Sequence, residues 1–443
     1  MRLIRLTLLT LVVGLVAPVP ALAQEARPNI LVIMTDDQRT ETFGVMPDLR
    51  AWFIEGGTVY TRATAPVPLC CPARASGFSG RYAHNTGVRT NDDALALDQS
   101  LTIQRSLREA GYRTAIFGKY LNSWPLADAP PHFDTWATFS KGRGDPDGYF
   151  NQEWNVQGQV RTIPTYTTDY ISNRAVEFLR AREAEDDQPW LLYLTPFAPH
   201  APATPERAYE NAPIPKWWGN PAFRESDRRD KPPYVRQQTQ SVQRMRDIRA
   251  RQLRTLMSVD DMVGRVMTVL SNLNENTLAI FTSDNGYQWG EHGLTNKTTP
   301  YTPSIMVPFL VRWPGHVAPS SKDGRLVSLI DIAPTVAEAA GLVPDPMMDG
   351  RSLFSSARDH ILTEFFTWPG YVVPTWASVR TNTYQYVEYY DGGSVTFREY
   401  YDLAADPWQL VNLLRDGDPS NPDLTAPKAL VAAAKVCAGV DCP

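Results

Sequence analysis

Residues 29–34 read Asn-Ile-Leu-Val-Ile-Met, a continuous apolar run that ends at Thr35-Asp36-Asp37. Such a short and uniformly apolar run is typical of a strand that is buried on both faces of a sheet. Similar runs occur at residues 114–117, 190–194 and 278–282, and each follows a helix-like segment, at residues 103–110, 171–181 and 248–273. Helices that alternate with apolar strands predict an α/β fold: a large, mostly parallel sheet covered by helices on both faces.

The sequence changes in character beyond about residue 355. Residues 372–379, 385–390 and 395–401 are rich in aromatic and β-branched residues, and Asp391-Gly392-Gly393 supplies a turn between the last two. We therefore expect a smaller C-terminal antiparallel sheet and a helix near residues 427–436. The predicted organisation is a main domain at residues 24–355 and a smaller C-terminal α+β subdomain at residues 356–443. Residues 211–251, rich in Pro, Trp, Arg and Gln, are expected to be irregular.

The first residues indicate export from the cell. Arg2 and Arg5 precede an apolar run at residues 6–16, and Ala21-Leu22-Ala23 supplies small residues at the cleavage positions. Residues 1–23 are therefore predicted to be a signal peptide cleaved after Ala23, and the protein to be secreted, periplasmic or extracellular. The apolar run is shorter than the ~20 residues of a membrane span, so no stable membrane anchor is expected.

Composition limits the partners that the protein can have. Hydrophobic residues make up 43% of the 443 residues and charged residues 21%, as in ordinary soluble globular proteins. The formal net charge of -5 provides no basic footprint of the kind that nucleic-acid binding requires. Nucleic acid is therefore not an expected partner.

The four cysteines fall into two pairs. Cys437 and Cys442 lie five residues apart, and in an exported chain they are predicted to form a small disulfide loop. Cys70 and Cys71 are adjacent, and neighbouring residues cannot easily close an ordinary disulfide because its geometry is restrictive. The second pair needs a different explanation.

Polar residues follow two of the apolar strands. Asp36 and Asp37 end the first strand, and Asp284 and Asn285 follow the run at residues 278–282. The carboxyl ends of parallel strands meet at one edge of a sheet, where ligands bind. Three carboxylates and an amide oxygen would suit a hard divalent cation such as Ca²⁺ or Mg²⁺. The alternative is a pair of Asx turns, which these residues alone do not exclude.

Residues 68–74 read Pro-Leu-Cys-Cys-Pro-Ala-Arg, and Ser79-Gly80-Arg81-Tyr82 follow. This Cys-x-Pro-x-Arg pattern resembles the signature of type I sulfatases of the alkaline phosphatase superfamily, in which the cysteine is oxidised to Cα-formylglycine during export. Further similar segments occur in the same order at residues 29–37, 117–122, 199–202, 283–286, 297–315 and 401–413. The Lys-Tyr-Leu-Asn form at residues 119–122 looks like the N-acetylglucosamine-6-sulfatase and heparan endosulfatase branch.

The resemblance implies a metal-dependent hydrolase of sulfate monoesters, with residues 24–355 as the catalytic domain. It implies Ca²⁺, with Mg²⁺ as an alternative, bound by five residues: Asp36, Asp37, Asp284, Asn285 and the formylglycine made from Cys70. The implied substrate is a small-molecule or glycan sulfate ester, such as N-acetylglucosamine 6-sulfate. The implied partner in maturation is a formylglycine-generating enzyme.

The implied roles agree with what the chemistry requires. A sulfate monoester resists attack because its oxygens are anionic, so the site must neutralise that charge. A hydrated aldehyde offers one hydroxyl that attacks sulfur and a second that, on losing its proton, lets sulfate leave. Arg74, about one helical turn after Cys70, would stabilise the ionised hydroxyl. Lys119 and Lys297 would hold the sulfate oxygens, and His200 is the candidate general acid for the leaving alcohol.

Each of these roles has a simpler alternative. Lys119 and Lys297 could be ordinary solvated lysines, and His200 could only brace a loop. For the whole chain, the alternatives are a phospho- or phosphonate-monoester hydrolase of the same superfamily and a non-catalytic carbohydrate-binding relative.

Three other polar features are interpreted as outside the catalytic machinery. His84 is expected to be structural, and His292 to lie at the rim of the site. Asp260-Asp261 imitates a metal-binding pair but falls within a predicted helix, so we expect a polar helix face there.

Overall fold

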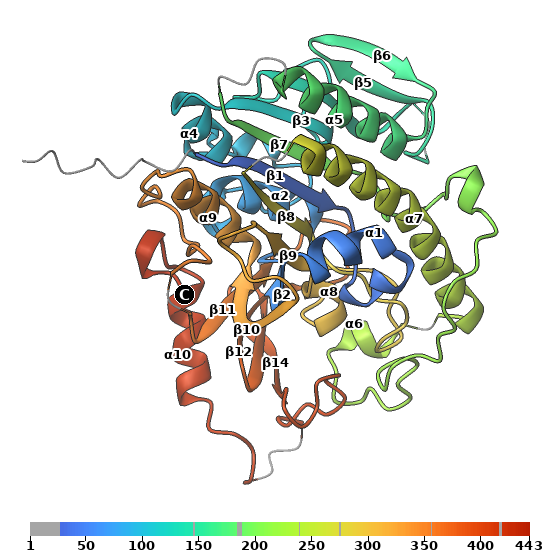
Figure 1. Cartoon of the computed structure of the whole chain (residues 1–443). Helices are drawn as coiled ribbons and strands as arrows, with labels where there is room; N and C mark the ends of the chain where they lie inside the picture. Colours follow the sequence, from blue (N-terminus) through green and yellow to red (C-terminus); the bar gives the residue numbers. More distant parts are fainter. Residues whose placement is uncertain are drawn as a thin grey trace, which may run out of the picture.

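The computed structural model describes residues 27–144, 147–183, 188–238, 240–273, 276–355, 357–415 and 419–443. The predicted signal peptide at residues 1–23 lies outside the described residues. A ten-stranded sheet forms the centre of the molecule, in the order β10-β2-β9-β8-β1-β7-β3-β4-β5-β6 (Figure 1). Its strands are β1 Asn29–Thr35, β2 Thr58–Thr64, β3 Arg113–Lys119, β4 Thr135–Gly144, β5 Gln152–Val156, β6 Gln159–Ile163, β7 Trp190–Thr195, β8 Thr277–Ser283, β9 Phe309–Arg312 and β10 Ser321–Ser328.

Helices cover both faces of this sheet (Figure 1). The α-helices are α1 Pro47–Leu49, α2 Cys70–Ser79, α3 Ala83–Thr86, α4 Ile103–Glu109, α5 Thr167–Glu183, α6 Pro233–Arg236, α7 Val242–Leu273, α8 Thr302–Ile305, α9 Ile332–Ala339 and α10 Thr425–Ala434. None of the helices in the described part of the chain is long and apolar enough to cross a membrane.

The central strand β1 confirms the prediction made from residues 29–34. It pairs in parallel with β7 on one side and β8 on the other. Its side chains alternate between two cores: Ile30 and Val32 pack with α2, α4 and α9, whereas Leu31 and Ile33 pack with α5 and α7. The α/β fold with helices on both faces is therefore confirmed.

Antiparallel pairs extend the sheet on both sides of its parallel centre. The strands β8, β1, β7, β3 and β4 are parallel neighbours, and β10 pairs in parallel with β2. Strand β9 pairs antiparallel with β8 and β2, and β5 pairs antiparallel with β4 and β6. The prediction of a mostly parallel sheet holds for its centre, where the polar strand ends meet.

A second sheet of four antiparallel strands lies in the C-terminal part of the chain. Its strands are β11 His360–Phe365, β12 Thr375–Thr381, β13 Tyr384–Asp391 and β14 Ser394–Asp402. The antiparallel sheet, the helix α10 and the Cys437–Cys442 disulfide confirm the predictions for this region. The strand predicted at residue 372 begins three residues later, and β11 was not predicted. The domain boundary at residue 355 stays a prediction.

Helix α7 corrects the prediction that residues 211–251 are irregular throughout. The helix begins at Val242, and its first three turns bury Met245, Arg249 and Gln252 on one side. Two of these three buried residues are polar, so the hydrophobic period in the sequence is hidden at the start of the helix. Arg249 is accommodated because its guanidinium lies over the rings of Trp217 and Trp289.

Candidate active site

The polar residues that follow β1 and β8 lie together, as predicted. The two strands are in register from Asn29 to Thr35, so Asp36 and Asp284 leave the sheet side by side. The backbone N–H of Asp284 donates to the carbonyl of Thr35 at 3.1 Å, and that of Asp37 donates to the Asp284 carboxylate at 3.1 Å. Asp37 adopts a φ of 70°, which turns the chain sharply at the end of the strand.

Helix α2 brings the cysteine and the arginine of the signature to this point. Cys70 is the first residue of the helix and Arg74 follows one turn later, and both side chains are buried. The Cys70 sulfur lies 3.4 Å from an oxygen of Asp36, and the Arg74 Nε donates to Asp284 at 2.9 Å. The prediction that Cys70 and Arg74 share one helix face is confirmed.

Two lysines bind the same carboxylates from other elements. Lys119, the last residue of β3, donates to Asp36 at 2.5 Å. Lys297 donates to Asp37 and, at 2.7 Å, to the Cys70 sulfur. The exposed fractions of Lys119 and Lys297 are 1% and 6%, so the interpretation as ordinary solvated lysines is wrong.

The tight backbone around Lys119 explains its position. Gly118 has a φ of 122°, and a Cβ there would overlap the carbonyl of Thr195 on the neighbouring strand β7. Only glycine permits β3 and β7 to approach so closely at this point. The next residue, Lys119, then lies at the carboxyl ends of the strands.

His200 faces the cluster from the loop after β7. Its Nε2 lies 3.8 Å from an Asp37 oxygen, and its Nδ1 lies 2.7 Å from the carbonyl of Ala201. A carbonyl can only accept, so Nδ1 carries the proton and the Nε2 lone pair points toward the cluster. Burial lowers the pKa of His200 to about 4, although Asp37 opposes the shift. The imidazole is therefore neutral near pH 7.

The charges in the cluster influence one another strongly. Burial alone would raise the pKa of Asp36, but Lys119, His200 and Arg74 hold it well below its usual value. Burial and the neighbouring Asp36 raise the pKa of Asp284 to about 6. Burial, again with Asp36, raises the pKa of Cys70 to about 12. Cys70 is consequently a neutral thiol at physiological pH, and a neutral thiol is a poor nucleophile.

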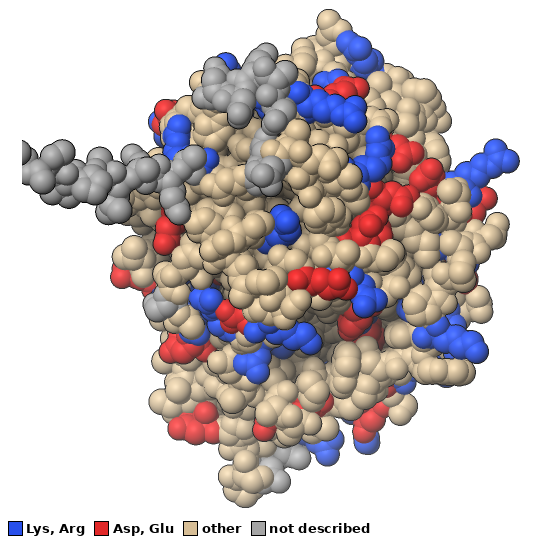
Figure 2. Space-filling view, in the orientation of Figure 1, with Lys and Arg blue, Asp and Glu red and all other residues tan. Residues whose placement is uncertain are grey.

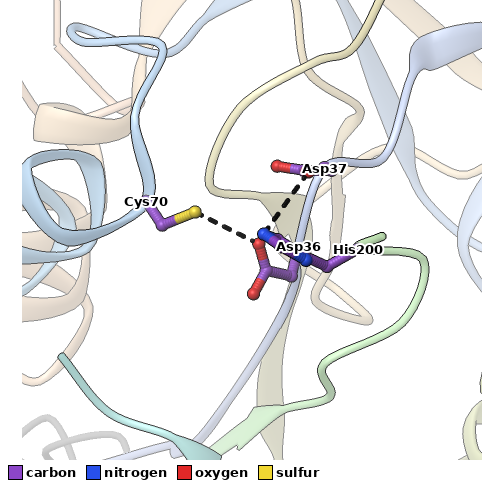
Figure 3. Close-up of side chains that lie close together, drawn as sticks. All are labelled: Asp36, Asp37, Cys70 and His200. Atoms are coloured by element: carbon purple, nitrogen blue, oxygen red, sulfur yellow. Dashed lines mark hydrogen bonds and ion pairs between the residues drawn. The ribbon is translucent and has the colours of Figure 1, made fainter. Parts of the chain in front are cut away.

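Four side chains are grouped closely enough to hold a metal ion. Ligand atoms of Asp36, Asp37, Cys70 and His200 all lie within 4.8 Å of one another (Figure 3). The carbonyl oxygen of the Asn285 side chain is also buried there and has no hydrogen-bond partner. These oxygens suit a hard cation such as Ca²⁺ or Mg²⁺, whereas the soft sulfur of Cys70 does not. An oxygen in place of that sulfur would give this group three oxygen donors and the nitrogen of His200.

The carboxylate of Asp284 is arranged differently from the predicted ligand set. One of its oxygens accepts from Arg74 and the other from the backbone of Asp37. In the described structure it orients these two residues. Its assignment as a metal ligand, and that of Asn285, stay predictions.

Opposite charges balance within the cluster. Three carboxylates, Asp36, Asp37 and Asp284, are paired with the three cations Arg74, Lys119 and Lys297. A divalent cation added to this balanced set would leave a buried excess of two positive charges. Such a site favours an anionic ligand, because charges interact strongly where water is excluded.

Two predictions about neighbouring residues were wrong. His292 is fully buried beneath Tyr301 and pairs with Glu225 at 2.8 Å, so it is not a rim residue. Asp260 does not form an exposed polar face with Asp261. Instead its carboxylate accepts the backbone N–H groups of Asp48 and Leu49 at 3.0 and 2.7 Å and thereby holds helix α1 against α7.

His84 is structural, as predicted. Its Nδ1 lies 3.0 Å from Glu364, and its Nε2 lies 3.0 Å from the carbonyl of Cys437. It therefore connects the segment after α2 to the C-terminal sheet and to the disulfide loop.

Two residues that support His200 were not found from the sequence. The ring of Phe197 stacks against the imidazole at 4.7 Å, and the Tyr149 hydroxyl donates to the His200 carbonyl at 2.6 Å. Phe197 continues the apolar run of β7, and this is the one sequence signal that could have drawn attention to it. No local pattern connects Tyr149 with a histidine 51 residues away.

The fold and the site together define a class: an α/β protein whose central parallel strands end at a buried cluster of charged side chains that could hold a metal ion. Two family models match the sequence, Sulfatase at residues 28–342 and N-sulphoglucosamine sulphohydrolase, C-terminal, at residues 290–427. The chain belongs to the sulfatase family, which confirms the resemblance seen in residues 68–82.

Individual relatives agree with this assignment. The chain is 33% identical over 75% of its length to the extracellular sulfatase SULF-1 homolog of Drosophila melanogaster. It is 29% identical over 89% of its length to the human N-acetylglucosamine-6-sulfatase and spans 82% of that protein. It spans 31% of the Drosophila protein and 49% of a Caenorhabditis elegans homolog.

A solved structure shares the fold of nearly the whole chain. It is a complex of a protein with its substrate D-glucosamine-2-N,6-O-disulfate, and it superimposes with a TM-score of 0.80 at 21% identity. The match covers 92% of this chain and 96% of the other.

Proposed function

We propose that this chain hydrolyses sulfate monoesters and that its nucleophile is a formylglycine made from Cys70. The observation that carries the proposal is the state of Cys70. Its sulfur is a buried, neutral thiol between a carboxylate at 3.4 Å and an ammonium at 2.7 Å. As a thiol it serves neither as a good nucleophile nor as a good ligand for a hard cation. Family membership supports conversion to a residue that bears oxygen.

Asp36, Asp37 and the oxygen of residue 70 would hold the metal, with Asn285, Asp284 and His200 as further candidates. Ca²⁺ is the proposed ion, with Mg²⁺ as the alternative, since the donors are mainly oxygens. When bound, the ion would neutralise sulfate charge and make a hydroxyl at residue 70 easier to deprotonate.

Lys119 and Lys297 could release their carboxylate partners when a metal binds and then contact the sulfate instead. Lys119 and Lys297 bind Asp36 and Asp37, the carboxylates assigned to the metal. A cation that claims these carboxylates would leave two buried ammonium groups free to bind the sulfate oxygens. Two fixed positive charges in a buried site stabilise the charge that develops as the ester bond breaks.

Arg74 and His200 complete the proposed machinery. The Arg74 Nη2 is buried without a hydrogen bond and lies 3.6 Å from Asp36, so it can donate to an ionised hydroxyl at residue 70. His200 is the candidate acid for the leaving alcohol. Because burial lowers its pKa to about 4, its protonation must accompany binding of the anionic substrate.

The proposed substrate is a sulfated sugar, of which N-acetylglucosamine 6-sulfate is the first choice. The name of the human relative and the substrate in the similar solved structure both point to sulfate on glucosamine. The extracellular Drosophila relative supports secretion, which would expose the chain to a formylglycine-generating enzyme on its way out of the cell.

Mass spectrometry of the tryptic peptide 63–74, from protein exported by its own host, tests the nucleophile. We expect the CH₂SH group at position 70 to have become CHO, with Cys71 intact. The same preparation should release sulfate from N-acetylglucosamine 6-sulfate and lose that activity with chelator. An unmodified Cys70 in folded protein would contradict the proposal and favour the carbohydrate-binding alternative. Faster release of phosphate from the matching phosphate ester would favour the phosphoesterase alternative.

A further inference from the structure

Two hollows adjoin the cluster, and one side chain lines both. The first has a volume of about 340 Å³ and is lined by Lys297 and Arg244 among other residues. The second has a volume of about 570 Å³ and is lined by Arg244, Tyr287 and the residues that follow His200. Both volumes fall in the range of roughly 300–1,000 Å³ that is usual for small-molecule sites. Arg244 therefore stands where the two hollows meet.

The position of Arg244 follows from the early start of helix α7. The helix begins at Val242, so Arg244 lies in its first turn and its side chain is exposed. Tyr287, two residues after the candidate ligand Asn285, lines the second hollow together with Arg244.

The charges that line the first hollow all have one sign. Lys297 and Arg244 are its charged lining residues, and it has no Asp or Glu among them. Lys297 is already paired with Asp37. For Arg244, no carboxylate in the described residues lies within ion-pair distance. The remaining polar lining includes the amides of Gln238, Gln240 and Asn296, which are suited to sugar hydroxyls.

Charges of both signs are mixed on the displayed face of the molecule. Figure 2 shows acidic and basic side chains interspersed on the face that it displays, without a continuous basic field. An isolated exposed arginine is ordinarily a solvated side chain. Arg244 differs because it lines both hollows without an ion-pair partner among the described residues, and because Lys297 lines one of these hollows.

We propose that Arg244 is a specificity-determining residue that binds a second anionic group of the substrate. The preferred sulfate ester is then carried on a sugar that has another anion, either a sulfamate or sulfate on the same ring or a carboxylate on a neighbouring ring. This inference rests on the proposed function, since it assumes that the scissile sulfate lies beside Lys297. A planar guanidinium suits both kinds of anion because it can donate two parallel hydrogen bonds.

Three probes distinguish the source of the second charge. They are N-acetylglucosamine 6-sulfate, glucosamine 2-N,6-O-disulfate, and a disaccharide of N-acetylglucosamine 6-sulfate with a hexuronic acid. The exported protein is compared with Arg244→Gln and with the control Arg246→Gln. Arg246 is exposed on the same helix and lines neither hollow. Hydrolysis and calorimetric binding are measured for every pair at low and at physiological salt.

We expect Arg244→Gln to lower kcat/KM for one of the doubly anionic probes by about tenfold, mainly through KM. The singly sulfated probe should change by less than about twofold, and Arg246→Gln should resemble the wild type. The probe that loses affinity identifies the source of the second anion. Arg244→Lys should restore only part of the difference, because an ammonium cannot donate as a fork.

An equal effect of Arg244→Gln on all three probes would overturn the inference, as would no effect on any of them. Failure of the proposed function gives a different result. If the wild type binds the doubly anionic probe in an Arg244-dependent way but releases no sulfate, the proposed activity is wrong and the binding role stands. Absence of both binding and hydrolysis by folded wild-type protein contradicts the two proposals together.

Discussion

Two buried charged networks in this molecule differ in how completely their hydrogen bonds are satisfied. In the C-terminal sheet, the fully buried carboxylate of Glu399 accepts from the hydroxyls of Tyr301, Tyr389 and Tyr401 at 2.7–2.9 Å. In the cluster at the strand ends, three carboxylates face three cations, and yet Arg74 Nη2 and the Asn285 side-chain oxygen have no hydrogen-bond partner among the described residues. Both networks consist of buried side chains.

The two networks differ in the hydrogen-bonding capacity that remains unused. Burying a charged group is costly unless its hydrogen bonds are made, and the tyrosines meet that requirement for Glu399. The catalytic cluster keeps polar atoms with bonding capacity left over, which is the capacity that a metal and a substrate would use. Of these two networks in the described residues, the cluster at the strand ends is the one with buried polar atoms that have no hydrogen-bond partner.

The largest expected effect comes from Cys70→Ser. Serine retains one hydroxyl but cannot form the hydrated aldehyde, so kcat/KM should fall by at least about 10³-fold. The melting temperature should change little, because the replacement is nearly isosteric. Kinetics and thermal denaturation of the purified variant check this. Cys71→Ser is the matched control, since Cys71 is also buried and its sulfur contacts the Asn122 carbonyl at 3.6 Å rather than a carboxylate or lysine of the cluster. Full activity of Cys70→Ser would contradict the mechanism.

Metal binding should depend more on Asp36 than on Asp284. Asp36 belongs to the group of ligand atoms within 4.8 Å, whereas both Asp284 oxygens bind protein donors. We expect Asp36→Asn to weaken Ca²⁺ binding by about 10- to 100-fold and Asp284→Asn to weaken it less. Calorimetric titration measures both, with exposed Asp261→Asn as the control. The reverse order would place Asp284 directly on the metal.

Glu399→Gln should damage stability and spare catalysis. The amide replaces a charged acceptor of three tyrosine hydroxyls, so the free energy of unfolding should fall by about 1–3 kcal/mol. Because the hydrogen bonds of these three tyrosine hydroxyls go to Glu399 and not to the carboxylates of the cluster, kcat/KM per folded molecule should stay within about threefold. Urea denaturation and kinetics measure the two effects. A large loss of activity in folded Glu399→Gln would show that activity depends on the Glu399 network, and the two networks would not be independent.

The smallest expected effect concerns His84. This residue connects the segment after α2 to the C-terminal sheet and the disulfide loop. Although burial lowers the pKa of His84, the hydrogen bond that its Nδ1 donates to the Glu364 carboxylate raises this pKa above its usual value. The native state thus favours the protonated imidazole, and its stabilising contribution is complete below about pH 6.5 and is lost as the pH rises through the folded-state pKa. Melting temperatures between pH 5.5 and 8.5 should show a shallower pH dependence for His84→Gln than for the wild type. If the melting temperatures of the wild type and of His84→Gln changed with pH in the same way, His84 would not be the source of this pH dependence.

The sequence predicted the centre of the sheet well because its strands are buried on both faces. The runs that became β1, β3, β7 and β8 are almost entirely apolar, and each was found. Strand β6 was missed because four of its five residues are exposed, so no hydrophobic period marks it. Strand β10 was missed because its first half, from Ser321 to Gly324, is polar and its pairing with β2 shifts register.

The site was predictable where it follows from strand topology. Asp36 and Asp284 had to meet because their strands are parallel neighbours, and Arg74 follows Cys70 by one helical turn. The pairing of Lys119 with Asp36 and of Lys297 with Asp37 depends on three-dimensional packing, which no sequence spacing encodes. The same is true of the burial of His292 and of the place of Arg244 between two hollows.

The burial of helix α2 has a consequence for the order of events during synthesis. All ten of its residues are buried in the folded protein, so an enzyme can reach Cys70 only before the chain closes around it. Lys297, which contacts the Cys70 sulfur, lies 227 residues later in the chain. At roughly 5–20 residues per second, translation takes about 10–45 s to cover that distance. Under the proposed function, the oxidation of Cys70 must therefore precede the arrival of β8 and Lys297, and slower folding would then yield more active protein.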